Sequence, residues 1–176
     1  MARFYSDHFS SDGSNKTSSD SQIRVSAGLS HGRVRYKRAI VSAMDSANAD
    51  EVRFAQFKSS DRIVELYLSG DGGGSAGTIN LGLYKSGTDH DGAVIDMDLF
   101  ASDVDTTGVL TRADQFKESG TLTDRDRGKT LWELATIGAA SYTSNPMEDW
   151  DLTGLMDAGS DAALELVMEI YYTSGD

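Results

Sequence analysis

The nine residues LELVMEIYY, numbered 164–172, decide the fold class of this 176-residue chain. Apolar side chains occupy every second position of the segment, from Leu164 through Met168 to Tyr172. A period of two places alternate side chains on opposite faces of an extended chain, so the segment predicts a strand with one buried face. The same period recurs upstream, in residues 33–40, 51–57, 61–69 and 78–84. The chain is therefore predicted to consist mainly of short strands.

Turn-forming residues separate these segments, and little of the chain has helical spacing. Residues 69–77 are rich in glycine, and we expect them to connect two strands. Residues 147–155 and 162–172 are expected to form a closing hairpin around a turn of small residues. Only residues 129–138 space their apolar side chains by three, which predicts one short helix.

The predicted fold class is all-β: an antiparallel β-sandwich, jelly-roll-like, with an extended N-terminal arm and at most one short helix. We expect residues 1–31 to form the polar arm and residues 32–176 to form the sandwich domain. Residues 6–31 include nine serines and few apolar side chains, so this region has no core of its own. Two interpretations stay open for it: a disordered tail, or an arm that orders on a partner.

Charge is spread unevenly along the chain. Its distribution limits the kinds of molecule that the protein is expected to bind. The formal net charge is −12, of which residues 1–60 carry +3 (nine bases, six acids) and the remaining 116 residues carry −15. An acidic body repels a phosphate backbone, so no nucleic-acid partner is expected. No apolar run approaches the roughly 20 residues that a membrane helix needs, so no membrane partner is expected either. The chain has no cysteine, which leaves no thiol chemistry.

A basic stripe stands out against this acidic background. Arg33, Arg35 and Lys37 lie on one face of a predicted half-buried strand, and Arg38 follows directly. The other face carries the apolar side chains Val34, Tyr36 and Ile40, which are expected to face inward. Three cations on one strand face are not expected to be buried without partners. The stripe is either a solvated edge strand or a contact surface for an acidic partner or a neighbouring copy of the chain. We take all four residues as candidate contacts with a partner or with a neighbouring subunit.

Several patterns that suggest chemistry lack the context that the chemistry needs. The loop 72–77 has the glycine spacing of a dinucleotide fingerprint and of a nucleophile elbow at Ser75, with His90 as the possible base. Both motifs require a helix after the loop, whereas an alternating strand follows. Acids gather between Asp89 and Asp105 without a complete calcium-loop pattern, so cation binding there stays an open question. No catalytic residue, cofactor or metal ligand is predicted, and the chain is not expected to be an enzyme.

The order of several short motifs resembles small virion structural proteins of tailed bacteriophages, in particular head decoration (cement) proteins. The glycine-rich loop and the strand ending in Gly-Leu-Tyr, within residues 61–84, form the first of these motifs. Asp-Leu-Phe-Ala-Ser at 98–102 and Leu-Trp-Glu-Leu at 131–134 follow in the same order. Trp-Asp-Leu-Thr at 150–153 and the segment 164–172 complete the resemblance, which spans about residues 33–172.

The resemblance implies a non-catalytic protein that binds the outer surface of the major capsid shell and stabilises the head. Such proteins are usually homotrimers, so the expected partners are the major capsid protein and the chain itself, and the expected location is the outer capsid surface of the virion. The alternative is a carbohydrate- or receptor-binding module of a phage head fibre or tail appendage. That module would use exposed aromatics such as Trp150 or Tyr172, together with calcium at Asp89 and Asp91.

Overall fold

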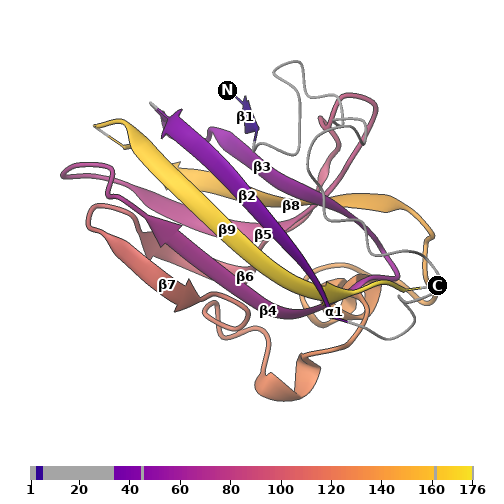
Figure 1. Cartoon of the computed structure of the whole chain (residues 1–176). Helices are drawn as coiled ribbons and strands as arrows, with labels where there is room; N and C mark the ends of the chain where they lie inside the picture. Colours follow the sequence, from indigo (N-terminus) through magenta and orange to yellow (C-terminus); the bar gives the residue numbers. More distant parts are fainter. Residues whose placement is uncertain (1–2, 6–33, 45, 161, 176) are drawn as a thin grey trace.

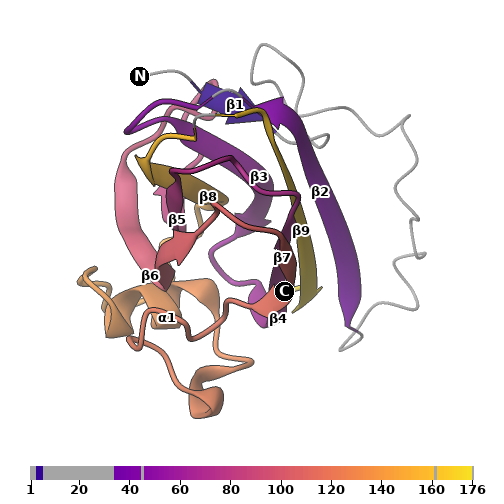
Figure 2. The same ribbon diagram turned by 90° about the vertical axis from the view of Figure 1, so that its left-hand side faces the viewer.

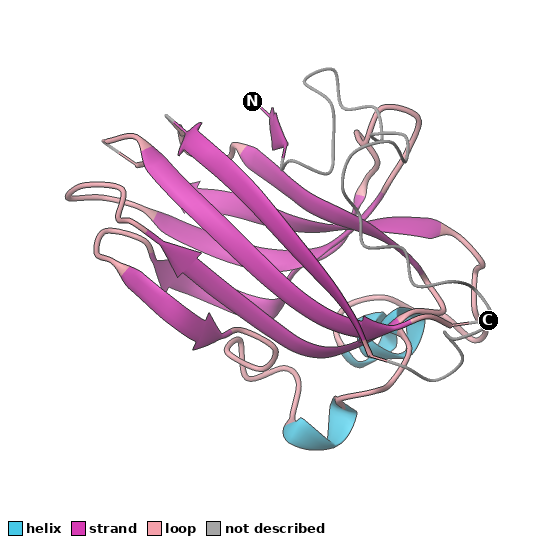
Figure 3. Ribbon diagram, viewed as in Figure 1, coloured by secondary structure: helices cyan, strands magenta, loops and turns pink. Residues whose placement is uncertain are grey.

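The computed structural model describes residues 3–5, 34–44, 46–160 and 162–175, and for residues 3–5 the backbone alone. Two β-sheets lie face to face, as Figure 1 and Figure 3 show, and a helical segment lies at one end. The predicted all-β sandwich with one short helix is confirmed.

The two sheets contain the nine described strands. One sheet has the order β2-β9-β4-β7, formed by Arg35–Met44, Leu164–Thr173, Arg62–Gly70 and Leu110–Asp114. The other has the order β1-β3-β8-β5-β6, formed by Arg3–Tyr5, Glu51–Lys58, Asp149–Ala158, Thr78–Lys85 and Val94–Asp105. The pair β1–β3 is parallel, and the other described pairs are antiparallel.

Consecutive strands alternate between the two sheets, apart from β5 and β6, which pair directly. The four-strand orders β2-β9-β4-β7 and β3-β8-β5-β6 make the sandwich jelly-roll-like. The predicted closing hairpin is therefore wrong, because β8 and β9 lie in different sheets. The small residues after β8 carry the chain from one sheet to the other instead of turning it back on itself.

The core lies between the sheets, and its pattern follows the alternation that defined the strands. Leu164, Leu166, Met168 and Ile170 of β9 are fully buried, as the segment 164–172 predicts. The facing sheet contributes large side chains that are also inaccessible to solvent: Phe54, Phe57, Ile79, Leu81, Leu83, Trp150 and Leu152. Burial of this much apolar surface is the main stabilising contribution to a domain of this size.

The segment between β7 and β8 contains the predicted helix. A short 3-10 helix, Asp124–Asp126, precedes α1, Leu131–Ile137, which lies on the β6 side of the sandwich (Figure 2). The helix begins with a capping arrangement in which the backbone N–H and the hydroxyl of Thr130 both donate to the Glu133 carboxylate, at 2.8 and 2.6 Å. It ends at Gly138, where it was predicted to end.

Strand β6 has twelve residues and is strongly bulged against β5. Between the pairs Leu81–Ala101 and Leu83–Asp96 the β6 side has more residues than the β5 side, so β6 bends across its neighbour. A Cβ atom at Gly82 would lie 2.0 Å from the Asp96 carbonyl oxygen, so only glycine allows this close approach.

The predicted arm is described only at its start. Residues 3–5 form β1, which pairs with β3 from Glu51 to Arg53, so this part of the arm joins the sheet of the sandwich. Residues 6–31 of the predicted arm lie outside the described residues. The boundary between arm and domain stays a prediction.

Candidate functional site

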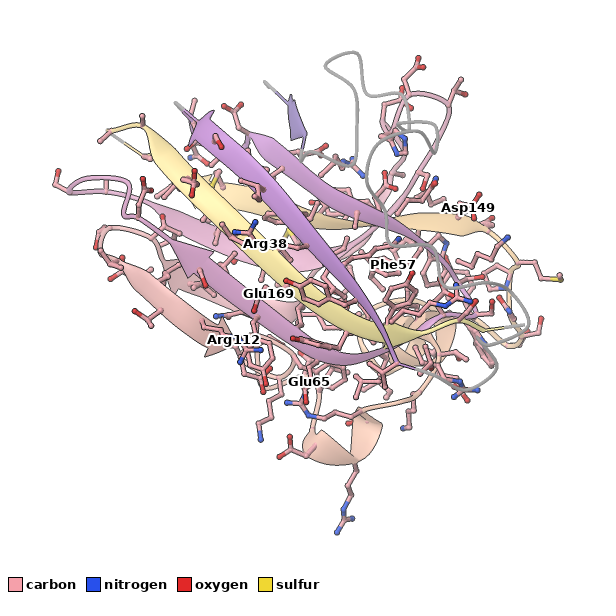
Figure 4. All side chains as sticks on the ribbon, viewed as in Figure 1. Arg38, Phe57, Glu65, Arg112, Asp149 and Glu169 are labelled. Carbon is pink, nitrogen blue, oxygen red and sulfur yellow. The ribbon has the colours of Figure 1, made fainter. Side chains whose placement is uncertain are left out.

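The outer surface of the sheet β2-β9-β4-β7 carries a group of accessible aromatic and charged side chains. We call this surface the tyrosine face and define it by residues from all four strands: Tyr36, Arg38, Tyr67, Arg112, Glu169 and Tyr171. Arg38, Glu169 and Arg112 follow one another across the sheet in Figure 4, from β2 through β9 to β7. Tyr36 is 49% exposed, although it lies within a regular strand.

The three tyrosines form a contiguous row because the strand register brings them together. Tyr36 pairs directly with Tyr171 across β2 and β9, with ring centroids 5.1 Å apart. Tyr67 of β4 meets Tyr171 edge to face at 6.4 Å. Both distances lie within the range of favourable aromatic pairs. The rings thus hold one another in place on rigid strands, which limits the rotamer entropy they would lose on binding a partner.

Glu169 is the polar centre of this face. Its carboxylate accepts hydrogen bonds from the Tyr36 hydroxyl at 3.1 Å and from Arg112 Nε at 2.8 Å. The bond from Arg112 is the main cause that lowers the pKa of Glu169 below its ordinary value. The Arg112 guanidinium also lies 3.8 Å from the centre of the Tyr67 ring. Tyrosine and arginine, locked by mutual contacts, are the residue types enriched at binding hot spots.

The structure divides the predicted basic stripe between two environments. Arg35 and Lys37 share one face, as predicted, but this face is the inner one, which they share with the buried residues Ala39 and Val41. The apolar set predicted to face inward is turned outward, because Val34 and Tyr36 are exposed. That assignment of faces is corrected here: β2 is an edge strand, and both of its faces carry apolar side chains.

Of the four candidate contacts, Arg38 lies on the tyrosine face, opposite Glu169 in the strand register. Lys37 points toward the interior, where its ammonium donates to the Gln56 carbonyl at 2.6 Å and lies 4.2 Å from the centre of the Phe57 ring. Burial lowers the pKa of Lys37 to about 8. Arg33 lies outside the described residues. A contact role for these four residues stays a prediction.

A cluster of buried polar side chains lies on the β3-β8-β5 sheet. Asp151 is fully buried, and it accepts hydrogen bonds from the Ser86 hydroxyl at 2.7 Å and shares one with His90 Nδ1 at 2.9 Å. Arg53, also fully buried, donates to Glu51 at 2.7 Å and lies 3.6 Å from Asp151. Ser86 and His90 both turn toward the carboxylate, so the serine lacks the hydrogen bond to histidine that activates a nucleophile. The cluster fastens the loop after β5 to the sheet.

The glycine-rich loop 72–77 forms neither a dinucleotide-binding site nor a nucleophile elbow, although its glycine spacing matches both motifs. Strand β5 follows it directly, so no helix N-terminus is available to hold a phosphate. Ser75 and His90 lie beyond opposite ends of the eight residues of β5, which separates them by roughly 25 Å at about 3.3 Å per residue. They cannot act together on one substrate.

The acids between Asp89 and Asp105 are divided between the loop after β5 and strand β6. Asp89 and Asp91 are exposed on the loop after β5, whereas Asp96 is buried and accepts a hydrogen bond from the backbone N–H of Ala139 at 2.9 Å. Burial is the main cause that raises the pKa of Asp96, and a hydrogen bond shared with Asp98 adds to it. Within residues 34–44, 46–160 and 162–175, no group of three or more histidine, aspartate or glutamate side chains has a metal-binding arrangement. In the same residues, no helix is long and apolar enough to cross a membrane.

The aromatic residues proposed for sugar or receptor binding are placed differently from expectation. Trp150 is fully buried in the core, and its indole N–H donates to Glu148 at 3.3 Å. Tyr172 is half-buried and packs edge to face against Phe57, with ring centroids 5.1 Å apart. The expectation that Trp150 is exposed is therefore wrong, because its strand turns this side chain inward.

The tyrosine face itself was missed by reasoning from the sequence. Tyr171 stands at an outward position of the segment 164–172, and Tyr67 and Tyr36 stand at outward positions of their own strands. For Tyr67 and Tyr171, an aromatic ring at a position predicted to face solvent is a signal that can be read from sequence, whereas Tyr36 was predicted to face inward. Its meaning depends on strand order, because only the arrangement β2-β9-β4 places the three rings side by side.

Solved structures with a similar fold were found by comparison. The structure is similar to a chain in the capsid of Ralstonia phage GP4, with a TM-score of 0.57 and 11% sequence identity, over 82% of this chain and 86% of that one. A chain of the cyanophage Pam1 capsid asymmetric unit aligns with a TM-score of 0.45 and 11% identity, over 90% of this chain and 97% of that one. No protein family and no curated protein matches the sequence. At this level of identity the likeness concerns the fold.

Proposed function

We propose that the protein is a non-catalytic structural component of a tailed-phage virion that decorates the outer surface of the capsid shell and stabilises the head. The major capsid protein is the proposed partner, and the chain itself forms the proposed homotrimer. The fold supports this proposal, since its likeness to a chain of a phage capsid extends over most of both chains. The sequence motifs between residues 61 and 172, taken in order, support the same assignment.

The observation that carries the proposal is the tyrosine face. A decoration protein needs an adhesive, rigid surface rather than a catalytic hollow, and four strands here hold aromatic and charged side chains in fixed positions. Arg38 belongs to this face, so the contact role predicted for the basic stripe is assigned to Arg38 among the described residues. Many copies on a symmetric shell reinforce weak single contacts through avidity.

The test is reconstitution on heads that lack the chain. Heads are purified from a phage in which a stop codon interrupts the gene, and purified protein is added back. We expect the chain to sediment with the heads and to raise their melting temperature. The double variant Tyr36→Ala, Arg38→Glu should bind at least tenfold more weakly, because it removes one aromatic contact and reverses one charge on the docking face.

The matched control is Val109→Ala, which truncates an exposed apolar side chain outside the tyrosine face; Val109 is 75% exposed. This variant should bind like the wild type. Full binding by the Tyr36 and Arg38 double variant would exclude the tyrosine face as the docking surface. Failure of the wild-type chain to bind heads at all would refute the decoration role.

The alternative, a carbohydrate- or receptor-binding module on a phage appendage, now depends on the tyrosine face rather than on Trp150. Tyrosines beside an arginine and a carboxylate offer both stacking and hydrogen bonds to a sugar. The rings of Tyr36, Tyr67 and Tyr171 are tilted against one another, however, and a flat platform is not formed. A glycan array with and without a chelator separates this function from decoration.

A further inference from the structure

Arg112, at the β7 edge of the tyrosine face, uses only part of its guanidinium group within the described part of the chain. Its side chain is 49% exposed, and its Nε atom donates to the Glu169 carboxylate at 2.8 Å. Within residues 34–44, 46–160 and 162–175, its terminal nitrogens Nη1 and Nη2 donate to no acceptor with hydrogen-bond geometry. A guanidinium group carries five N–H donors in a planar fork, so those on Nη1 and Nη2 remain available to a partner.

Contacts with the tyrosine face fix the orientation of this group. The guanidinium carbon Cζ lies 3.8 Å from the centre of the Tyr67 ring, which places the cation over the ring. The hydrogen bond to Glu169 is the largest cause that raises the pKa of Arg112 above its ordinary value, and the Tyr171 hydroxyl adds to this rise. The group is therefore ordered before a partner arrives, and little side-chain entropy is lost when it binds.

The backbone at Arg112 also indicates a function for this arrangement. Its φ of 38° lies in the positive region that residues other than glycine rarely adopt, and its backbone N–H donates to Ser69 Oγ at 3.1 Å. Such conformations cost free energy and are concentrated at sites that bind ligands or partners. An ordered, half-exposed arginine on a strained backbone is thus a candidate anchor for another molecule.

The chemistry of the available donors selects the partner group. Nη1 and Nη2 present parallel N–H groups that match the two oxygens of a carboxylate, whereas a lysine offers a point charge. The net charge of −12 makes the chain repel anions at long range, so an anion is retained only where fixed donors receive it. A protein shell presents its anions as aspartate and glutamate side chains.

We propose that Arg112 binds an aspartate or glutamate side chain of the shell protein through Nη1 and Nη2. The inference rests on the proposed function, because it names the chemical group that the partner presents to the tyrosine face. Tyr67 and Tyr171 meet edge to face beside the guanidinium, so the methylene groups of the bound acidic side chain pack against aromatic rings. Glu169 is the residue that holds Arg112 in this orientation.

Head binding by substituted proteins tests this contact. Arg112→Gln removes the charge and the fork, so it should bind heads at least tenfold more weakly than the wild type. Arg112→Lys keeps the charge without the fork, and it should bind at least threefold more weakly. Arg125→Gln, at an exposed arginine of the 3-10 helix, is the matched control and should bind like the wild type. Arg112→Gln should unfold at nearly the wild-type urea concentration, which separates a loss of binding from a loss of fold.

Chemically modified heads identify the group that Arg112 binds. Treatment of heads with a carbodiimide and glycinamide converts their accessible carboxylates into neutral amides. The wild type and Arg112→Gln should bind the treated heads with nearly equal affinity, whereas they differ at least tenfold on untreated heads. If the treatment weakens both proteins by the same factor, or leaves their ratio unchanged, Arg112 does not bind a carboxylate and the inference is overturned.

The binding of untreated heads separates this inference from the proposed function. Wild-type affinity of Arg112→Gln or of Arg112→Lys for untreated heads would overturn the contact through the fork and leave the decoration role intact. Failure of the wild type to bind untreated heads would instead refute the decoration role itself.

Discussion

At the scale of the residue, Lys37 makes the stability of the fold depend on pH. Among the described residues no carboxylate forms an ion pair with its ammonium, which contacts a carbonyl and aromatic rings instead. Burial lowers its pKa to about 8, below the ordinary value of 10.5. The unfolded chain therefore binds the proton more tightly than the folded chain, and the free energy of unfolding should rise as the pH increases from 8 to 10.5.

The measurement is chemical denaturation of the wild type and Lys37→Met between pH 7 and 10.5. The difference between the two proteins removes the contribution of tyrosines that titrate in the same range. We expect the wild type to gain on the order of 1 kcal/mol per pH unit relative to the variant. Lys58→Met, at an exposed lysine on β3, should follow the wild type. Parallel pH profiles for the wild type and Lys37→Met would show that Lys37 has an ordinary pKa.

At the scale of the element, Asp61 joins the turn between β3 and β4 to the end of the chain. Its carboxylate accepts the backbone N–H groups of Lys58 and Gly175, both at 2.9 Å, and the residue is buried. Asp61→Ala leaves these donors without an acceptor, which should lower the free energy of unfolding by about 1–3 kcal/mol. Asp157→Ala, at an exposed aspartate near the end of β8, should change it little. Equal effects of the two substitutions in urea denaturation would show that the turn does not depend on Asp61.

The sequence predicts the buried face of a strand only when one of its two faces is clearly more apolar than the other. Strand β9 was predicted because its core face alone is strongly apolar. Strand β2 was placed the wrong way round, since Val34 and Tyr36 face outward while Lys37 faces inward near Ala39. Period two defines two faces but does not say which is buried when an edge strand carries apolar residues on both.

Which segments form strands could be predicted from the sequence better than which strands pair with each other. Adjacent strands usually pair, which favoured a hairpin of β8 with β9, but here the chain crosses between sheets after β8. The tyrosine face depends on this crossing, because β9 carries Tyr171 into the position between Tyr36 and Tyr67. No local pattern contains that information.

At the scale of the whole molecule, charge should control self-association. A net charge of −12 makes the identical copies of the proposed homotrimer repel one another. Added salt screens the repulsion and leaves apolar burial intact. The dissociation constant of the oligomer should therefore fall several-fold between 50 and 500 mM sodium chloride in sedimentation velocity experiments. A contact made chiefly by oppositely charged groups would instead weaken with salt.

The order of the strands also governs when the chain can fold. Interior positions of both sheets are filled by β8 and β9, which are synthesised after the other described strands. Until they leave the ribosome, β3 has no antiparallel neighbour and β2 has none at all among the described strands. Native structure must therefore form after translation has reached residue 173, and most of its pairings join segments far apart in the chain, which makes such folding slow. During synthesis a pool of unfolded chains should accumulate ahead of the folded protein, and a premature stop before β8 should yield no partly folded product.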